Sequence, residues 1–292
     1  MYNVILLCTG GSETLSQKLV NSVYSSMDGQ NLSWLCDDEA VCFHVEKKST
    51  AHYEIWSHLQ RIKVDMVFQK KENHFKSLLL ADMDSTMIEQ ECIDELADMC
   101  GVGSEVKKIT TRAMNGELGF HDALNERVSL LAQCPSSIVE QVLEKRITFR
   151  PGGKTLVSTM KANGAYTALV SGGFTAFSIP IGINLGFDEQ NANILVEENG
   201  VFTGKVAEPI LGKNEKVNQL NRLVKERGLM HSDVLAVGDG ANDLEMLEIA
   251  GIGVAMHAKP IVAEKCDIVI NHCDLSSLLY LQGYKKEDFV ST

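Results

Sequence analysis

Hydrophobic and polar positions follow two different patterns along the chain, and the change falls near residue 76. Before it, short apolar stretches predict strands, and two longer stretches carry apolar residues at helical spacing. The predicted strands are Asn3–Cys8, Leu32–Cys36, Ala40–Val45 and Lys63–Gln69, and the predicted helices are Glu13–Met27 and His52–Ile62. This βαββαβ order is the split pattern of a ferredoxin-like domain, which we expect over residues 1-72.

After residue 76, Ser77–Asp82 reads as a strand with almost no alternation, which is typical of a strand covered on both faces. Residues from about 89 to 146 then show helical spacing throughout, and beyond Gly152 strands and helices alternate. The strands are Tyr166–Ser171, Val234–Gly238 and Ile252–Met256, the helices are Thr155–Lys161, Phe174–Ile183, Asn214–Arg227 and Asn242–Ile249, and a hairpin spans Asn193–Val206. We therefore predict an α/β domain over 76-292, a Rossmann-like doubly wound parallel sheet with 89-146 as a helical insertion.

Open parallel sheets place their chemistry at the carboxyl ends of strands, and two such ends carry suggestive residues here. In Asp82-Met83-Asp84-Ser85-Thr86, two carboxylates follow a strand and can reach one site, although a surface turn or a helix cap would explain them too. In Ser171-Gly172-Gly173, a hydroxyl and glycines come between a strand and a helix. Free N–H groups there would form a phosphate seat, and an ordinary glycine turn is the alternative.

Two further positions in the sequence carry candidate functional residues. Lys216 stands in the first turn of a predicted helix, where a cation is locally unfavourable; a solvated position is the alternative, and Lys213 is a nearby competitor. Asp239, flanked by glycines, ends another strand, and Asp243 follows four residues later. Clustered hard oxygen ligands suit Mg²⁺, and a capping box is the alternative for Asp239 or Asn242.

In this order the four motifs resemble those of the haloacid dehalogenase-like phosphohydrolases. The resemblance implies that Asp82 is a nucleophile that becomes phosphorylated, and that Asp84 is general acid and then general base. Asp at position 84, where the family's ATPases have Thr, favours rapid hydrolysis and hence a phosphatase. Ser171 and the Gly172 N–H would bind phosphate oxygens, and Lys216 would neutralise negative charge.

The same resemblance implies a Mg²⁺ ion held by the Asp82 carboxylate, the Asp84 main-chain carbonyl and Asp239. Asn242 and Asp243 would orient the water shell of the metal or the lysine. Asp84 has to be protonated for the first step. We expect the negative charges of the phosphate and of Asp82 to raise its pKa.

Residues of the helical insertion narrow the resemblance to the phosphoserine phosphatase branch of that family. Glu91 matches an acid that binds an ammonium group, Met114 and Phe120 match an apolar shield, and Arg127 matches a carboxylate-binding Arg. An acid for an ammonium and an Arg for a carboxylate suit an α-amino acid, so the expected reaction is hydrolysis of O-phospho-L-serine to L-serine and phosphate. A surface ion pair, or two unrelated charges, is the alternative for Glu91 and Arg127.

Other readings stay open at this point. The enzyme could act on phosphohomoserine or phosphothreonine, or transfer phosphate to an alcohol. The chain could instead be a non-catalytic amino-acid-sensing regulatory protein whose working part is the N-terminal unit. That unit resembles the ACT-like half of bacterial phosphoserine phosphatases. Amino-acid regulation, assembly of a homodimer and a plain folding role are all compatible with it.

The composition of the chain restricts its binding partners more than it restricts any reaction that it catalyses. The chain has 292 residues, of which 45% are hydrophobic, and a formal net charge of -12, which argues against binding nucleic acid or an anionic membrane but not against a small anionic substrate. No apolar stretch approaches the length of a membrane helix. The eight cysteines form no CxxC pair. We therefore expect eight free thiols and a cytoplasmic location.

Overall fold

The computed structural model describes the chain except for residues 12–13, 49–51, 71–74, 115–116, 213 and 291–292. Contacts divide it into two compact units. The first comprises residues 1–79, 151–166 and 228–292, and the second comprises residues 80–150 and 167–227. The predicted domain boundary near residues 72–76 falls largely on a segment outside the described residues and stays a prediction.

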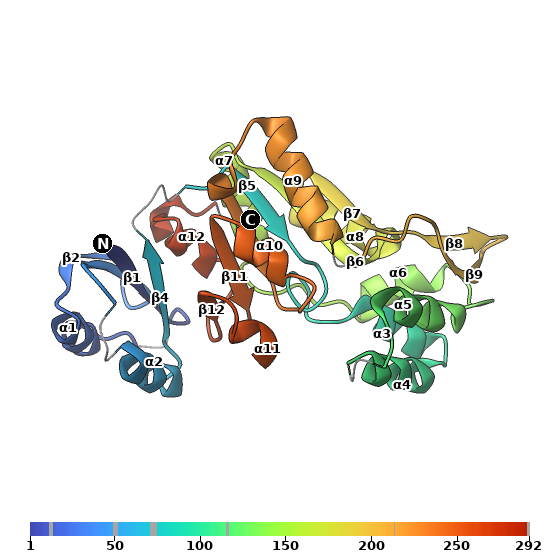
Figure 1. Cartoon of the computed structure of the whole chain (residues 1–292), viewed down its shortest axis with the longest axis horizontal. Coiled ribbons are helices and arrows are strands. Elements are labelled where there is room, and N and C mark those ends of the chain that lie inside the picture. Colours follow the sequence, from blue (N-terminus) through green and yellow to red (C-terminus); the bar gives the residue numbers. More distant parts are fainter. Residues whose placement is uncertain (12–13, 49–51, 71–74, 115–116, 213, 291–292) are drawn as a thin grey trace. The chain divides into compact units, whose positions relative to one another are not determined.

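The first unit begins with a four-stranded antiparallel sheet in the order β2-β3-β1-β4. Its elements are β1 (Tyr2–Leu7), α1 (Gln17–Ser26), β2 (Gln30–Cys36), β3 (Ala40–Val45), α2 (His52–Arg61) and β4 (Asp65–Lys70). Both helices cover the same face of this sheet (Figure 1), because Val4 and Leu6 of β1 pack with Val20 and Leu59 in one core. The predicted ferredoxin-like fold is confirmed.

The rest of the first unit surrounds three parallel strands. Its elements are α7 (Gly153–Ala162), β10 (Val234–Gly238), α10 (Leu244–Ile249), β11 (Ile252–Met256), α11 (Pro260–Ala263), β12 (Ile268–Ile270) and α12 (Ser277–Leu281), with short 3-10 turns at His231–Asp233 and Lys286–Asp288. Strand β11 pairs in parallel with β10 on one side and with β12 on the other.

The second unit contains four helices of the predicted insertion and the elements that follow them. They are α3 (Cys92–Met99), α4 (Gly103–Met114), α5 (Phe120–Ser129), α6 (Ile138–Lys145), β6 (Tyr166–Phe174), α8 (Thr175–Leu185), β7 (Glu189–Asn193), β8 (Leu195–Glu198), β9 (Val201–Val206) and α9 (Glu215–Arg227). Strands β6 and β7 are parallel, and β8 and β9 form the predicted hairpin.

Strand β5 (Leu78–Ala81) is the central strand that the unbroken apolar run predicts. The six-stranded sheet has the order β12-β11-β10-β5-β6-β7, and all four residues of β5 are buried. The predicted parallel α/β core is confirmed. The sequence pattern missed both edge strands: β7 is the polar stretch Glu-Gln-Asn-Ala-Asn, and β12 has only three residues.

The expectation of eight free thiols is wrong for two of them. Cys100, which follows α3, and Cys134, which precedes α6, form a disulfide within the second unit. The other six cysteines are free thiols. The two partners are 34 positions apart, so no short cysteine motif marks this pair, and only the folding of the helical insertion brings the sulfur atoms together.

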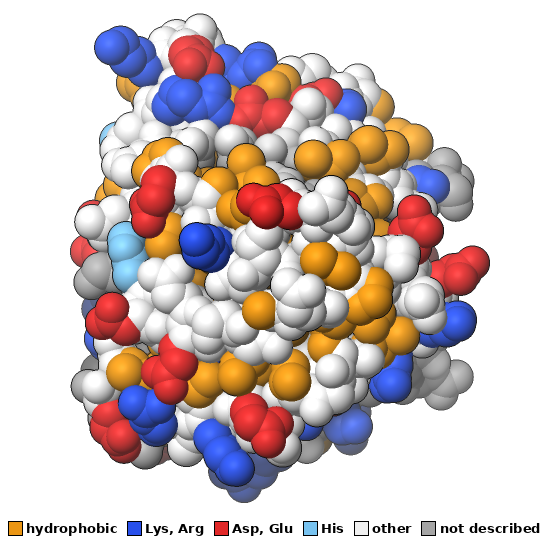
Figure 2. Space-filling model, turned by 90° about the vertical axis from the view of Figure 1, so that its right-hand side faces the viewer, with side chains coloured by type: hydrophobic (Ala, Val, Ile, Leu, Met, Phe, Trp, Pro, Cys, Tyr) orange, Lys and Arg blue, Asp and Glu red, His pale blue; other side chains and the backbone are white. Residues whose placement is uncertain are grey.

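The surface mixes charges of both signs. On the face drawn in Figure 2, acidic and basic side chains are interspersed with hydrophobic ones, so the negative net charge is not gathered into one acidic surface there. In the described part of the chain, no helix is both long enough and apolar enough to cross a bilayer.

Candidate active site

Asp82 and Lys216 form a buried ion pair. Asp82 directly follows β5, and Lys216 lies in the first turn of α9. The Lys216 Nζ is 2.5 Å from the Asp82 Oδ1, and the two side chains are only 3% and 8% exposed. Lys216 is therefore not a solvated surface residue. Burying two charges is costly unless they are paired, and this pairing offsets the locally unfavourable position of a lysine at a helix start. The competitor Lys213 lies outside the described residues.

The Asp84 carboxyl group is held by two donors from different elements. The N–H of Cys92, the first residue of α3, donates to Oδ1 at 2.8 Å, and the Ser171 hydroxyl donates to Oδ2 at 3.3 Å. Desolvation by burial raises the pKa of Asp84, while the contacts with Cys92, Ser171 and Lys216 act in the opposite direction. The main cause of this rise is thus burial. A raised pKa favours the protonated carboxyl group that a general acid requires.

The segment Ser171-Gly172-Gly173 belongs to the end of β6, which extends to Phe174. The Gly173 N–H donates to the Ser171 Oγ at 2.8 Å. A Cβ atom at Gly173 would lie 2.8 Å from the Asp84 Oδ2, so this position has no room for a side chain. The glycine therefore allows the end of β6 to approach the acid closely.

Asn193 holds the same segment from the end of β7. Its Nδ2 donates to the Gly172 carbonyl at 3.0 Å, and its Oδ1 accepts the Leu211 N–H at 2.7 Å. Sequence reasoning assigned no role to Asn193. The only signal was an Asn in a short polar stretch, and its burial becomes evident only in the fold.

Glu91 lies at the N-cap of α3 and is linked through Ser85 to the segment that follows β5. The Ser85 hydroxyl donates to Glu91 Oε1 at 2.9 Å, and Arg150 Nε donates to the Ser85 carbonyl at 3.1 Å. Ser85 has a φ of 57°, in the left-handed region that non-glycine residues adopt infrequently. Arg150 was also missed, because it reads from the sequence only as part of the turn before Pro151.

Arg127 lies in the last turn of α5, and its Nε donates to the Ala123 carbonyl at 3.2 Å. Burial lowers its pKa, and the negative charges of Asp94, Glu91 and Asp84 oppose that shift. Arg127 is thus within electrostatic reach of all three acids in the same unit. Among the described residues, nothing accepts a hydrogen bond from its two terminal guanidinium nitrogens, so these remain available for a carboxylate.

Of the two predicted shield residues, Phe120 lies next to Gly172 of the predicted phosphate seat. Its ring lies beside Gly172, with Cζ at 3.6 Å from the place that a Cβ of Gly172 would take. The helical insertion and the end of β6 therefore meet inside the second unit. Met114 is the last residue of α4, and its side chain lies outside the described part.

In the first unit, the segment after β10 is shaped by its own side chains. The Gly240 N–H donates to the Asp243 Oδ2 at 2.9 Å, and both Asp239 and Asp243 are buried. A Cβ at Gly238 would lie 2.3 Å from the Asp243 Cγ, and one at Gly240 would lie 2.4 Å from the Asn242 Oδ1. The side chains of Asp243 and Asn242 thus fold back over the two glycines next to Asp239, and they leave little room for a Cβ atom at Gly238.

Lys259 is a further neighbour of Asp239 that sequence reasoning did not identify. Its N–H donates to the Asp239 carbonyl at 3.2 Å, and its Nζ is 3.7 Å from the Asp239 Oδ2. Nothing in the local sequence marks Lys259, since it lies in a loop twenty residues further on.

Three acids among the predicted metal-binding and supporting residues are buried: Asp82 in the second unit, and Asp239 and Asp243 in the first. Their carboxylates are hard oxygen donors, which are the ligands that Mg²⁺ prefers. The chemistry of these donors therefore fits the predicted ion.

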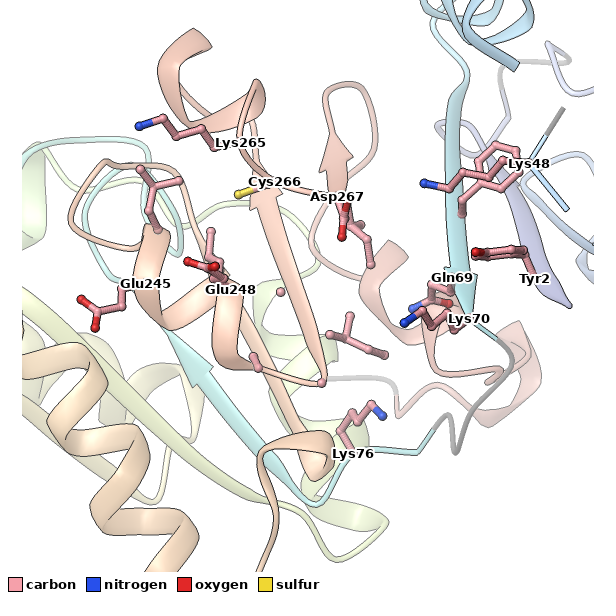
Figure 3. Close-up of a pocket in the computed structure, with 18 residues that line it drawn as sticks. Tyr2, Lys48, Gln69, Lys70, Lys76, Glu245, Glu248, Lys265, Cys266 and Asp267 are labelled. Atoms are coloured by element: carbon pink, nitrogen blue, oxygen red, sulfur yellow. The ribbon is translucent and has the colours of Figure 1, made fainter. Parts of the chain in front are cut away.

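A cavity of about 1210 Å³ in the first unit is separate from these residues. Strand β4 lines one side with Gln69 and Lys70, and Glu248 and Asp267 lie on the other (Figure 3). None of the predicted site residues lines it, so this cavity is not the candidate active site.

Comparisons with known proteins agree with the fold. Residues 79–248 match the haloacid dehalogenase-like hydrolase family. A crystal structure of a hydrolase of that family from Salmonella enterica serovar Typhi superposes with a TM-score of 0.84 at 28% identity, covering 96% of this chain and 98% of that one. The chain belongs to the haloacid dehalogenase-like hydrolases.

Within that family, several relatives of the chain are phosphoserine phosphatases. The chain is 44% identical over 204 residues to the phosphoserine phosphatase of Methanocaldococcus jannaschii, a match covering 70% of this chain and 96% of that protein. It is 42% identical over 221 residues to that of Archaeoglobus fulgidus, where the match covers 75% of this chain and 64% of the longer relative.

Proposed function

We propose that this hydrolase is a Mg²⁺-dependent phosphoserine phosphatase that releases L-serine and phosphate. The observation that carries the proposal is the buried ion pair between Lys216 and Asp82. In the same unit, burial raises the pKa of Asp84 and so favours the protonated form of its carboxyl group. A nucleophilic carboxylate and a separate proton donor are what two-step phosphate transfer requires. The names of the relatives support phosphoserine as the substrate.

In the first step, the Asp82 carboxylate attacks phosphorus and the bond from phosphorus to the serine oxygen breaks. Asp84 gives its proton to that oxygen, and Lys216 balances negative charge on the nucleophile and the phosphoryl group. In the second step, water attacks phosphorus, Asp84 takes the proton of the water, and the bond to Asp82 breaks. Ser171 and the Gly172 N–H hold the phosphoryl oxygens in both steps.

Mg²⁺ would be held by the Asp82 carboxylate, the Asp84 main-chain carbonyl and Asp239, with Asn242 and Asp243 as supporting residues. When bound, Mg²⁺ supplies positive charge that lets an anionic nucleophile approach an anionic phosphate. The burial of the Asp82, Asp239 and Asp243 carboxylates supports this assignment.

The substrate's amino-acid part is assigned to the helical insertion. Glu91 faces the ammonium, and the terminal nitrogens of Arg127 take the carboxylate in a bidentate manner. Phe120 and Met114 exclude water from the phosphate seat.

The test is phosphate release from phosphoserine, with and without Mg²⁺, by the wild type and by Asp82→Asn. We expect metal-dependent turnover that the substitution abolishes. Phosphohomoserine and phosphothreonine, assayed in parallel, report on specificity. Turnover by Asp82→Asn at the wild-type rate, or turnover unaffected by removal of divalent ions, would contradict the proposal.

A further inference from the structure

Asp65, the first residue of β4, is fully buried and accepts three consecutive main-chain N–H groups. They come from Asn271 at 3.0 Å, His272 at 2.9 Å and Cys273 at 3.1 Å, in the turn that follows β12. Hydrogen bonds to a charged acceptor are among the strong ones, and a buried carboxylate needs them. Asp65 therefore fastens the N-terminal sheet to this turn within the first unit.

Gln60 of α2 strengthens the same attachment. Its Nε2 is 3.3 Å from the Asp65 Oδ1, and its Oε1 accepts a hydrogen bond from the Asn271 side chain at 2.8 Å. Both the main chain and the side chain of Asn271 are thus held by residues of the N-terminal sheet and its helix.

The same turn holds His257, which follows β11. The His257 N–H donates to the Ile270 carbonyl at 2.8 Å, and its Nδ1 lies 3.1 Å from the Asn271 carbonyl oxygen. His257 has a φ of 48°, in the left-handed region. A non-glycine residue keeps this conformation only when its surroundings enforce it, and the contacts with Ile270 and Asn271 do so.

Two residues further on, Lys259 contacts Asp239 through its main chain and its side chain, as described above. Hydrogen bonds thus join Asp65 to Asn271 and Asn271 to His257, the main chain connects His257 to Lys259, and a hydrogen bond joins Lys259 to Asp239. All of these residues belong to the first unit.

We propose that Asp65 is a positioning residue for Asp239: by fixing the 271–273 turn, it holds the 257–259 loop and thereby the main chain and carboxylate of Asp239. The N-terminal sheet would then contribute to divalent-ion affinity without contacting the ion. The proposal rests on the proposed function in one respect, namely that Asp239 binds that ion. Outer residues that orient a ligand are known to change metal affinity.

The test compares Asp65→Asn with Glu39→Gln in the full chain. Glu39 also ties the N-terminal sheet to the C-terminal part, because its carboxylate accepts hydrogen bonds from Tyr280 at 3.0 Å and Lys286 at 3.0 Å. These partners are not part of the path to the 257–259 loop. Both variants weaken the attachment of the N-terminal sheet, but only Asp65→Asn removes contacts that lead to Asp239. Comparing them therefore distinguishes the two effects.

Mn²⁺ binding without substrate is measured by the paramagnetic resonance of free Mn²⁺, and thermal unfolding is recorded alongside. We expect both variants to unfold at lower temperature. Only Asp65→Asn should raise the Mn²⁺ dissociation constant, by roughly 3- to 10-fold. At saturating Mg²⁺ the KM for phosphoserine should stay unchanged, because the path does not reach the helical insertion.

His257→Ala removes the contact between the His257 ring and the Asn271 carbonyl, and it replaces Asp65→Asn as the test variant if that protein fails to fold. We expect it to weaken Mn²⁺ binding to a similar degree. Wild-type affinity in both Asp65→Asn and His257→Ala would overturn the proposal, as would an equal loss in Glu39→Gln. These results leave the proposed function intact. Failure of the wild type to bind Mn²⁺ or Mg²⁺ would overturn both.

Discussion

The Lys216 Nζ lies 2.5 Å from the Asp82 Oδ1, with both groups buried. Replacing Lys216 by Met removes the cation that balances the nucleophile and the phosphoryl group. We expect phosphoserine turnover to fall by roughly 10²- to 10³-fold, comparable to the loss of one transition-state donor. Lys213→Met is the matched control and should keep wild-type turnover. The assignment would be reversed if the Lys213 variant were the inactive one.

Asp84 should make the metal-free protein less stable as pH rises. Because burial raises the pKa of this acid, the folded state binds more protons than the unfolded state between the ordinary and the raised value, so stability falls as pH rises through that window. Asp84→Asn carries no such titration. Its melting temperature should exceed that of the wild type near pH 8, and the difference should shrink as pH falls toward about 4, the ordinary value for Asp. Scanning calorimetry in EDTA measures this, and a constant difference would contradict it.

Arg127 should discriminate substrates by their carboxylate. Arg127→Lys keeps the charge but loses the planar pair of donors, so the KM for phosphoserine should rise by roughly 10- to 100-fold. Phosphoethanolamine, which lacks the carboxylate, is the control substrate. Its kinetic constants should be nearly the same for wild type and variant. Equal losses on both substrates would show that Arg127 acts on the fold and not on the carboxylate.

The Cys100–Cys134 disulfide should stabilise the oxidised protein. It closes a loop between positions 34 apart, which is worth about 2–4 kcal/mol through restriction of the unfolded chain. The Cys100→Ser/Cys134→Ser double variant should therefore unfold at lower denaturant than the wild type without reductant, and at the same denaturant with it. Cys36→Ser, at a free thiol, is the control. Mass spectrometry of the alkylated, unreduced protein should find six modified thiols; eight would contradict the pairing.

The local pattern of hydrophobic residues was sufficient to predict most of the strands and helices of the core. Strand β5 was predictable because four buried apolar residues in succession suit a strand covered on both faces. Strands β7 and β12 were not, since one is polar and the other very short, and their pairing depends on neighbours distant in sequence. The cysteine pair was missed for the same reason.

The sequence by itself determined the order of elements, the family resemblance and the residues that carry it, because these depend on spacing between near neighbours. The sequence alone did not reveal the contacts that position these residues in the folded protein. The N–H of Cys92 on Asp84, the amide of Asn193 on Gly172 and the contact of Lys259 with Asp239 each join residues brought together only by folding. The raised pKa of Asp84 belongs with them, because desolvation is a property of the packed site and not of the residue.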